Sequence, residues 1–197
     1  LMRILVDIEG LSWEEAWEIT VNTFAYTNHT VLPEALEKWT VELFEYLLPR
    51  HLQIIYEINH RFLNEVRYKY PGDEARLVRM SLIEEAPEKR IRMANLAIVG
   101  SHSINGVAAL HTEIIKNELF LDFYEMYPER FNNKTNGITQ RRWLKKCNPK
   151  LSNLISHEIG EAWTTDLYQL QQLKPLAEVA SFRQEWQEVK KLNKEKL

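Results

Sequence analysis

Residues 93–117 read MANLAIVGSHSINGVAALHTEIIKN and carry the strongest indication of the fold. After an alternating start from Arg90, residues 96–99 form a continuous apolar run that ends at Gly100, which is typical of a buried strand. The segment SHSING then reads as a loop, and residues 107–117 show helical spacing, with Gly106 beside the expected helix start. Strand, loop and helix in this order predict a βα unit and hence an α/β fold.

Upstream, a second strand is expected to end in polar residues. Residues 23–26 are β-branched and aromatic, which predicts a short buried strand followed by Thr27, Asn28 and His29. Ligands bind outside the carboxyl ends of strands in open α/β sheets, and these side chains can hydrogen-bond sugar hydroxyls. The residues alone leave open a second interpretation, in which His29 is a hydrogen-bonded core histidine next to a helix cap.

Helices account for most of the remaining chain. Ser12 with Glu15 three residues later predicts a capped helix over residues 12–23. Apolar residues at helical intervals predict a long amphipathic helix over residues 48–70, closed by the sequence PGD. Turn residues cluster at positions 133–137 and helical patterns follow, so this cluster is the expected boundary between two parts of the chain.

A helix starting near Thr139 places Asn136, Arg141, Arg142 and Trp143 within about two helical turns. Asn136 offers a donor and an acceptor to a sugar, and Trp143 offers a flat apolar face to a sugar or an aromatic cofactor ring. The alternative interpretation is a turn, a solvated basic pair and a core tryptophan.

Composition argues against several classes of protein. The 197 residues are 45% hydrophobic with a formal net charge of -3, so no global basic field favours nucleic acid. No apolar run reaches the roughly 18 residues of a membrane span, and the first residues lack a signal-peptide pattern, which predicts a soluble, cytoplasmic protein. Cys147 is the single cysteine in the sequence; it cannot form an internal disulfide and is expected to be a partly buried thiol.

Common catalytic and cofactor motifs are also missing from the sequence. His102 and His111 lack the spacing of metal ligands, and HEIGE at His157 lacks the second histidine of a zinc protease, so no metal site is expected. Neither a GxGxxG fingerprint, a phosphate-loop GK[ST] nor a GxSxG elbow occurs. Taken alone, the residues predict a ligand the size of a sugar or a phosphate.

The chain resembles a known family over almost its whole length. Four segments in order, AYTNHTVLPEALEKW at residues 25–39, LLPRHLQIIYEINHRFL at 47–63, MANLAIVGSHSINGVAALHTEII at 93–115 and FNNKTNGITQRRWL at 131–144, resemble the glycogen, starch and maltodextrin phosphorylases. These pyridoxal-phosphate-dependent enzymes cleave α-1,4-glucans with inorganic phosphate to give glucose 1-phosphate. The resemblance implies a partial two-lobed glycosyltransferase fold of the GT-B type, helix-rich and α/β. Residues 1–134 would close the first lobe and residues 135–197 would supply the opening helices of the second.

The resemblance also implies roles for individual residues. His29 and Asn136 are similar to the pair that hydrogen-bonds the glucosyl unit, Val107 to a residue lining its pocket, and Trp143 to a neighbour of pyridoxal phosphate. A surface glycogen-storage site is implied for Gln53, Tyr56, Arg61, Glu85 and Lys89.

The motifs around the Schiff-base lysine of the family do not occur in this sequence, so we expect the isolated chain to be inactive. Leu1 in place of a start methionine, and a charged helical end that stops without a cap, predict a fragment at both ends. The family further implies a homodimeric parent enzyme. The alternative is a non-catalytic glucan-binding or scaffold module derived from the family.

Overall fold

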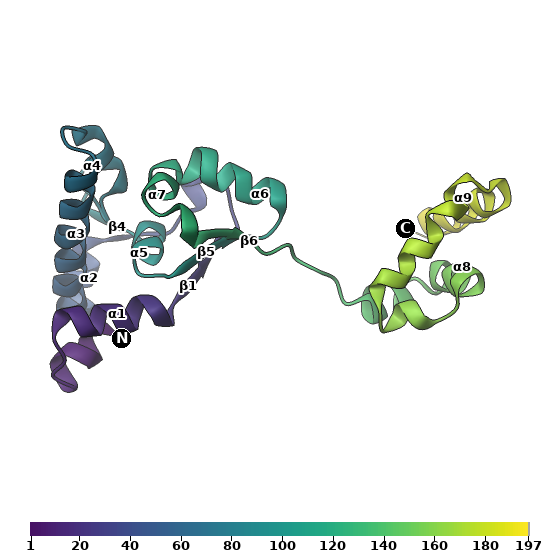
Figure 1. Ribbon diagram of the computed structural model, residues 1–197, viewed down its shortest axis with the longest axis horizontal. Helices are drawn as coiled ribbons and strands as arrows, with labels where there is room; N and C mark the ends of the chain where they lie inside the picture. The colour runs from purple at the N-terminus through teal and green to yellow at the C-terminus, as the bar shows by residue number, and fades with distance from the viewer. Residues whose placement is uncertain (197) are drawn as a thin grey trace. The chain divides into compact units, whose positions relative to one another are not determined.

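The computed structural model describes residues 1–196 and shows two compact units, Leu1–Asn136 and Gly137–Leu197 (Figure 1). Short 3-10 or π segments are labelled η. The elements of the first unit are η1 (Ile4–Ile8), α1 (Trp13–Thr23), β1 (Ala25–Thr27), η2 (Pro33–Ala35), β2 (Lys38–Thr40), α2 (Val41–Leu47), α3 (Pro49–Lys69), α4 (Glu74–Met80), β3 (Ile83–Glu84), β4 (Arg90–Arg92), α5 (Met93–Val99), β5 (Ser103–Gly106), α6 (Ala109–Ile114), η3 (Ile115–Leu119), α7 (Leu121–Met126), η4 (Pro128–Arg130) and β6 (Phe131–Asn133). Those of the second are η5 (Arg141–Lys146), α8 (Pro149–Ile159), η6 (Ala162–Thr164), η7 (Leu167–Leu173), η8 (Pro175–Glu178) and α9 (Ala180–Lys194). This is a helix-rich α/β fold.

Two helices form where the sequence predicts them. The hydroxyl of Ser12 accepts a hydrogen bond from the N–H of Glu15, and the carboxylate of Glu15 accepts one from the N–H of Ser12, so α1 begins with a complete capping box. In α3, 21 residues long, Ile58, Phe62 and Val66 repeat at intervals of four and are buried. This spacing puts them on one face of the helix.

The first unit contains two small sheets. Strands β1, β5 and β6 are parallel in the order β1-β5-β6, and strands β2, β4 and β3 are antiparallel in the order β2-β4-β3. In the parallel sheet Thr27 pairs with Asn105, and Gly106 pairs with Asn133. Figure 1 shows α6 and α7 together along one side of this sheet. The three strands therefore end close to one another, at a single edge.

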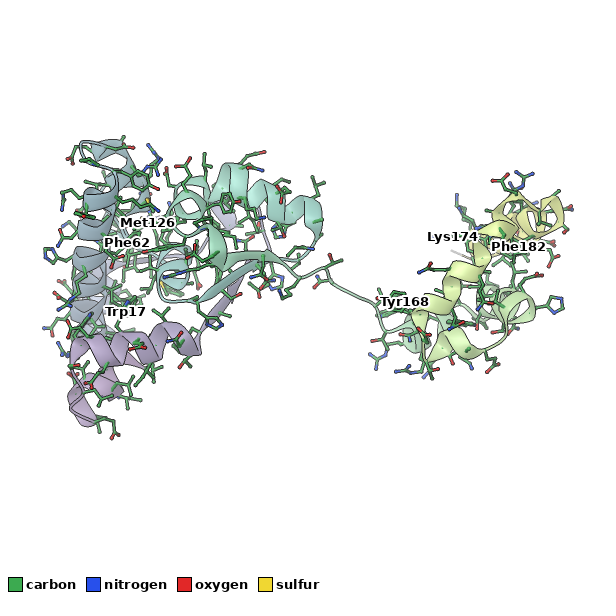
Figure 2. All side chains as sticks on the ribbon, viewed as in Figure 1. Trp17, Phe62, Met126, Tyr168, Lys174 and Phe182 are labelled. Atoms are coloured by element: carbon green, nitrogen blue, oxygen red, sulfur yellow. The ribbon has the colours of Figure 1, made fainter. Side chains whose placement is uncertain are left out.

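Helix α3 contributes to two hydrophobic cores. Its residues Ile54, Ile58, Phe62 and Val66 belong to the main core, together with Ile104 of β5 and residues of α1, α4, α5 and α7. Figure 2 labels Phe62, Met126 and Trp17 in this region of the first unit. The smaller core, under the antiparallel sheet, consists of Val41, Leu52, Ile55, Ile83 and Ile91. Helix α3 thus packs against both cores.

The structure corrects the expected strand at residues 96–99, because these residues lie in helix α5. Asn95 and Val99 are buried four residues apart, as are Ala94 and Ile98, which is the spacing of one helix face. The strand instead occupies Ser103–Gly106, which the sequence indicated as a loop, and the expected helix beyond it begins at Ala109. A short apolar run cannot by itself distinguish a buried strand from a buried helix.

The upstream strand forms at Ala25–Thr27 and not at residues 23–26, since Thr23 still belongs to α1, and its expected burial was also wrong. In β1, Ala25 and Thr27 are exposed and Tyr26 is half-buried. The reason is its position, because β1 is an edge strand of the described sheet and has β5 as its neighbour. Residues 131–133 form strand β6, so Asn133, expected at the start of the cluster of turn residues, is the last residue of a strand.

The second unit is built from helical segments around a small core. Trp163 is fully buried, and its ring N–H donates to the hydroxyl of Ser156 on α8 over 3.1 Å. Leu154, Ile155 and Phe182 complete the buried apolar set. Figure 2 labels Tyr168, Lys174 and Phe182 in this unit. Cys147 is exposed, which corrects the expectation of a partly buried thiol, because it lies at the end of η5 and outside the core.

Within residues 1–196, no helix combines the length and the apolar character that crossing a bilayer requires.

Replacing Phe62 by alanine should lower the free energy of unfolding of the first unit by about 3–5 kcal/mol, because a ring stacked on Phe123 at 5.9 Å between centroids is lost from the main core. Hydrogen exchange of the α3 amides measures this free energy. The control is Tyr68→Ala on the same helix, where the side chain is 92% exposed and should change little. Equal protection in the two variants would contradict the assigned core.

Candidate functional site

The carboxyl edge of the parallel sheet gathers polar residues from three separate parts of the chain. Strands β1, β5 and β6 end at Thr27, Gly106 and Asn133, and His29, Val107 and Asn136 follow within three residues of those ends. In open α/β sheets, ligands bind outside this end of the strands. The three residues that resemble glucosyl contacts are therefore brought to one edge by the topology of the sheet.

Hydrogen bonds beyond the strand ends tie these segments together. The hydroxyl of Thr27 donates to the side-chain carbonyl of Asn105 over 2.8 Å. The backbone N–H of Asn28 donates to the backbone carbonyl of Asn105 over 2.9 Å. On the other side, the N–H of Asn136 donates to the carbonyl of Val107 over 2.9 Å. The backbone positions at this edge are consequently fixed relative to one another.

Asn28 is the buried centre of the edge, with 1% of its surface exposed. Its amide NH₂ donates to the hydroxyl of Tyr26 over 3.1 Å, and its carbonyl oxygen accepts from the N–H of Thr30 over 3.0 Å. Burial raises the pKa of the Tyr26 phenol, although the hydrogen bond with Asn28 opposes that shift. A buried amide with both of its ends bonded holds the loop that carries His29 in one conformation.

The three candidate contact residues differ in exposure. His29 and Asn136 are exposed, whereas Val107 is half-buried. Val107 follows β5, the middle strand of the sheet, and the other two follow the outer strands β1 and β6. An imidazole and an amide supply donors and acceptors, and a valine supplies an apolar surface. Such an edge suits a small polyhydroxy ligand that presents hydroxyls and an apolar ring face.

Gly106 lets helix α6 come unusually close to strand β5. A Cβ atom at this position would lie 2.5 Å from the hydroxyl oxygen of Thr112 and 2.9 Å from its Cα. Thr112 is buried, and its hydroxyl donates to the side-chain carbonyl of Asn133 over 2.9 Å. The glycine therefore allows the contact that joins α6 to the ends of β5 and β6.

A separate hollow of about 760 Å³ lies on another part of the first unit. Four of its charged lining residues form ion pairs: Lys38 with Glu84 at 2.9 Å, and Arg79 with Asp122 at 2.7 Å. None of His29, Val107 and Asn136 lines it. The candidate site within this unit is thus an open sheet edge and does not coincide with that hollow.

Trp143 belongs to the second unit. It lies on η5 and is 62% exposed. Its backbone N–H donates to the backbone carbonyl of Thr139 over 2.9 Å. The helical segment η5 begins at Arg141, two residues after the expected start near Thr139, and the core-tryptophan interpretation is wrong for this residue. Arg141 beside it donates to the carbonyl of Thr164 over 2.8 Å.

The structure divides the residues of the expected storage surface. Glu85 and Lys89 form an ion pair at 3.0 Å; the hydrogen bond with Glu85 raises the pKa of Lys89, and the nearby Tyr56 adds to that shift. Gln53 precedes Tyr56 by three residues on α3. Arg61 lies five residues after Tyr56, about 140° around the helix, because each residue of a helix turns by about 100°.

Arg61 instead faces helix α1. It contacts Glu57 at 2.6 Å and Glu14 at 2.8 Å, and its guanidinium lies 5.0 Å from the ring centre of Trp13. Arg61 is thus bonded to its own helix and to α1, while 44% of its side chain stays exposed, and its part in the storage surface stays a prediction like that of the other four residues.

Two residues of the edge were not identified from the sequence as a connected pair. Asn28 and His111 are 83 residues apart, and the Nε2 atom of His111 lies 3.0 Å from the Oδ1 atom of Asn28. One signal was present, because Asn28 follows Tyr26 of the expected buried strand by two residues, the period at which side chains point to the same face. For His111 no comparable pattern is present, and from the sequence it was considered only as a metal ligand.

Comparison with known proteins gives a match over the whole chain. The family model described as carbohydrate phosphorylase matches residues 1–197. This chain belongs to the carbohydrate phosphorylase family. It is 59% identical to the glycogen phosphorylase of Synechocystis sp. over 197 residues, and 61% identical to the muscle form of glycogen phosphorylase of Bos taurus over 194 residues. These alignments cover 100% and 98% of this chain, and in both cases 23% of the relative. The phosphorylase chain described here thus spans about a quarter of the length of these relatives.

Replacing Gly106 by alanine should lower the free energy of unfolding of the first unit by about 1–3 kcal/mol, because the new methyl group meets the backbone of Thr112 as well as its hydroxyl. Hydrogen exchange of the β5 and α6 amides is the measurement. At Gly137 a Cβ would meet no atom within 4 Å, so Gly137→Ala is the matched control. Unchanged protection of α6 in Gly106→Ala would show that the close approach is not required.

Proposed function

We propose that this chain is part of a pyridoxal-phosphate-dependent α-glucan phosphorylase, which transfers terminal glucosyl units of an α-1,4-glucan to inorganic phosphate and releases glucose 1-phosphate. The observation that carries the proposal is the common edge of β1, β5 and β6, which brings together His29, Val107 and Asn136. Membership of the carbohydrate phosphorylase family supports it.

In this proposal the sheet edge binds and orients the glucosyl ring. The imidazole of His29 and the amide of Asn136 hydrogen-bond its hydroxyls, while Val107 contacts the apolar face of the ring. Fixing the ring lets a hydrogen bond strengthen as an oxocarbenium-like transition state forms, and such a gain accelerates the reaction. The anchored backbone of Asn28 and Asn136 supports this role, because it limits the motion of both contact residues.

Pyridoxal phosphate would be the cofactor of the whole protein. Trp143 fits a contact with its ring, since the indole is 62% exposed and offers a flat apolar face. When bound, the cofactor supplies acid–base chemistry through its phosphate. The sequence has no Schiff-base lysine motif of the family, so the chain alone is expected to show no turnover.

We further propose the GT-B architecture for the whole protein, with residues 1–134 closing its first lobe and residues 135–197 opening its second. The parallel sheet in the first part and the helical segments in the second are compatible with it. A homodimeric, cytoplasmic enzyme remains a prediction from the family.

A second candidate function is glucan binding at the α3 surface, where Tyr56 lies near the Glu85–Lys89 ion pair. Tyr56 is 38% exposed, and an exposed aromatic ring beside hydrogen-bonding groups is what binding of an oligosaccharide requires. In a complete enzyme this surface would hold the polymer; in a non-catalytic module it would be the function itself.

In the full-length protein, His29→Ala and Asn136→Ala should each lower kcat/KM for glucan phosphorolysis by about 100-fold, because each removes a hydrogen bond that strengthens in the transition state. The release of glucose 1-phosphate measures turnover. The control is Asn193→Ala on α9, whose side chain bonds Asn148 within the second unit. Turnover like that of the unmodified protein in both His29→Ala and Asn136→Ala would refute the site.

Tyr56→Ala should weaken binding of maltoheptaose to the chain about tenfold, because the stacking face for a glucose ring is removed. Isothermal titration calorimetry gives the Kd. Tyr46→Ala, at a tyrosine that is 84% exposed on α2, should leave the Kd unchanged. If both variants bind as the unmodified chain does, the α3 surface is not a glucan site.

A further inference from the structure

The side chain of His111 connects two strand ends of the candidate site. His111 lies in the first turn of α6, four residues after Val107, and is half-buried. Its Nδ1 atom accepts a hydrogen bond from the backbone N–H of Val107 over 3.1 Å. Its Nε2 atom lies 3.0 Å from the side-chain carbonyl oxygen of Asn28. One ring thus spans from the end of β5 to the end of β1.

The partners of the ring determine its tautomer. A backbone N–H can only donate, so Nδ1 must carry a free electron pair toward Val107. An amide oxygen can only accept, so Nε2 must carry the proton that is donated to Asn28. Both contacts require the same form, the neutral imidazole with its proton on Nε2.

The orientation of the Asn28 amide is fixed by independent contacts. Its oxygen also accepts from the N–H of Thr30, and its NH₂ donates to the hydroxyl of Tyr26. Turning the amide over would set its NH₂ against two donors. Donation therefore runs from Val107 to His111 and from His111 to the side-chain oxygen of Asn28, which also accepts from the N–H of Thr30. His29 lies in the sequence between the two residues of this last bond.

We propose that His111 is a positioning residue, which sets the distance between the segment carrying His29 and the segment carrying Val107. The inference rests on the proposed function, in which both of those residues contact the glucosyl unit. His111 itself contacts neither the sugar nor the phosphate in this proposal. Its contribution is to hold two contact segments in register across the sheet edge, because misplacement of contacts by about 1 Å can cost a factor of about 100 in rate.

Two variants separate the two halves of the connection. In His111→Asn, the amide oxygen occupies the place of Nδ1 and can still accept from Val107, but nothing reaches Asn28. In His111→Gln, the longer amide can place an NH₂ where Nε2 stood and still donate to Asn28, but the bond to Val107 is lost. Neither residue offers both groups at the spacing of an imidazole.

The first test is made on the chain itself. In the unmodified chain, ¹⁵N–¹H correlation spectra of the histidine rings should show His111 with its proton on Nε2 alone. Hydrogen exchange should accelerate at least tenfold at the Thr30 amide in His111→Asn, and at the Val107 amide in His111→Gln. His157→Asn, at an exposed histidine of α8, is the control and should change neither amide. A proton on Nδ1 of His111, or unchanged exchange in both variants, would overturn the proposal, and the spectrum of the unmodified chain needs no variant to fold.

The second test uses the full-length protein and its steady-state kinetics. His111→Asn and His111→Gln should lower kcat about 10- to 100-fold, with the KM for glucan changed by less than about threefold, because the ring positions groups that act in the transition state. A variant pair with altered amide exchange but unaltered kcat would overturn the positioning role. Failure of the proposed function is distinguishable, since His29→Ala and Asn136→Ala would then retain turnover while the tautomer and the exchange pattern of His111 stayed as expected.

Discussion

The parallel pairing of β1, β5 and β6 is the constraint on which the candidate site depends. The strands contain only three or four residues each, so their register leaves little freedom in where they end. A shift by one residue would turn the side chains of a strand to the other face and move its polar end away from the edge. The buried neighbours Ile104 and Phe131 oppose such a shift, because they would leave the main core. Core packing and site geometry are therefore set by the same few pairings.

Buried polar contacts at the edge add to the strand pairing in holding the three strand ends together. Asn28 and Thr112 are buried polar residues: Asn28 bonds Tyr26 of β1 and lies within hydrogen-bond distance of His111 on α6, and Thr112 of α6 bonds Asn133 of β6. Left without partners, such groups would destabilise the unit, since an unsatisfied buried polar group costs about 1–3 kcal/mol. With their partners in place they favour one arrangement of the three strand ends. The strand ends would therefore need little rearrangement to bind a ligand.

Local patterns in the sequence were sufficient for some elements and insufficient for others. Helices α1 and α3 were predictable, because the Ser12–Glu15 capping box and the repeating apolar face of α3 lie within each helix. The segment from Met93 to Gly106 was misassigned, since a short apolar run suits helix and strand equally and strand β5 is stabilised by pairing with residues far away in sequence. For the candidate site, residues such as His29 and Asn136 could be proposed by resemblance to the family. The link between Asn28 and His111 depends on a contact across 83 positions, and no local pattern encodes it.

The position of α3 between two cores has a consequence for local motion. The three-stranded antiparallel sheet contributes only Ile83 and Ile91 to the smaller core of five residues, and local opening of such a small sheet costs less than unfolding of the whole unit. Opening it would carry Glu85 and Lys89 away from Tyr56, while the opposite face of α3 stayed packed in the main core. The parallel sheet edge would keep its geometry during that event. The α3 surface around Tyr56 and the edge of the parallel sheet would therefore open independently, and solvent could enter behind the first without changing the second.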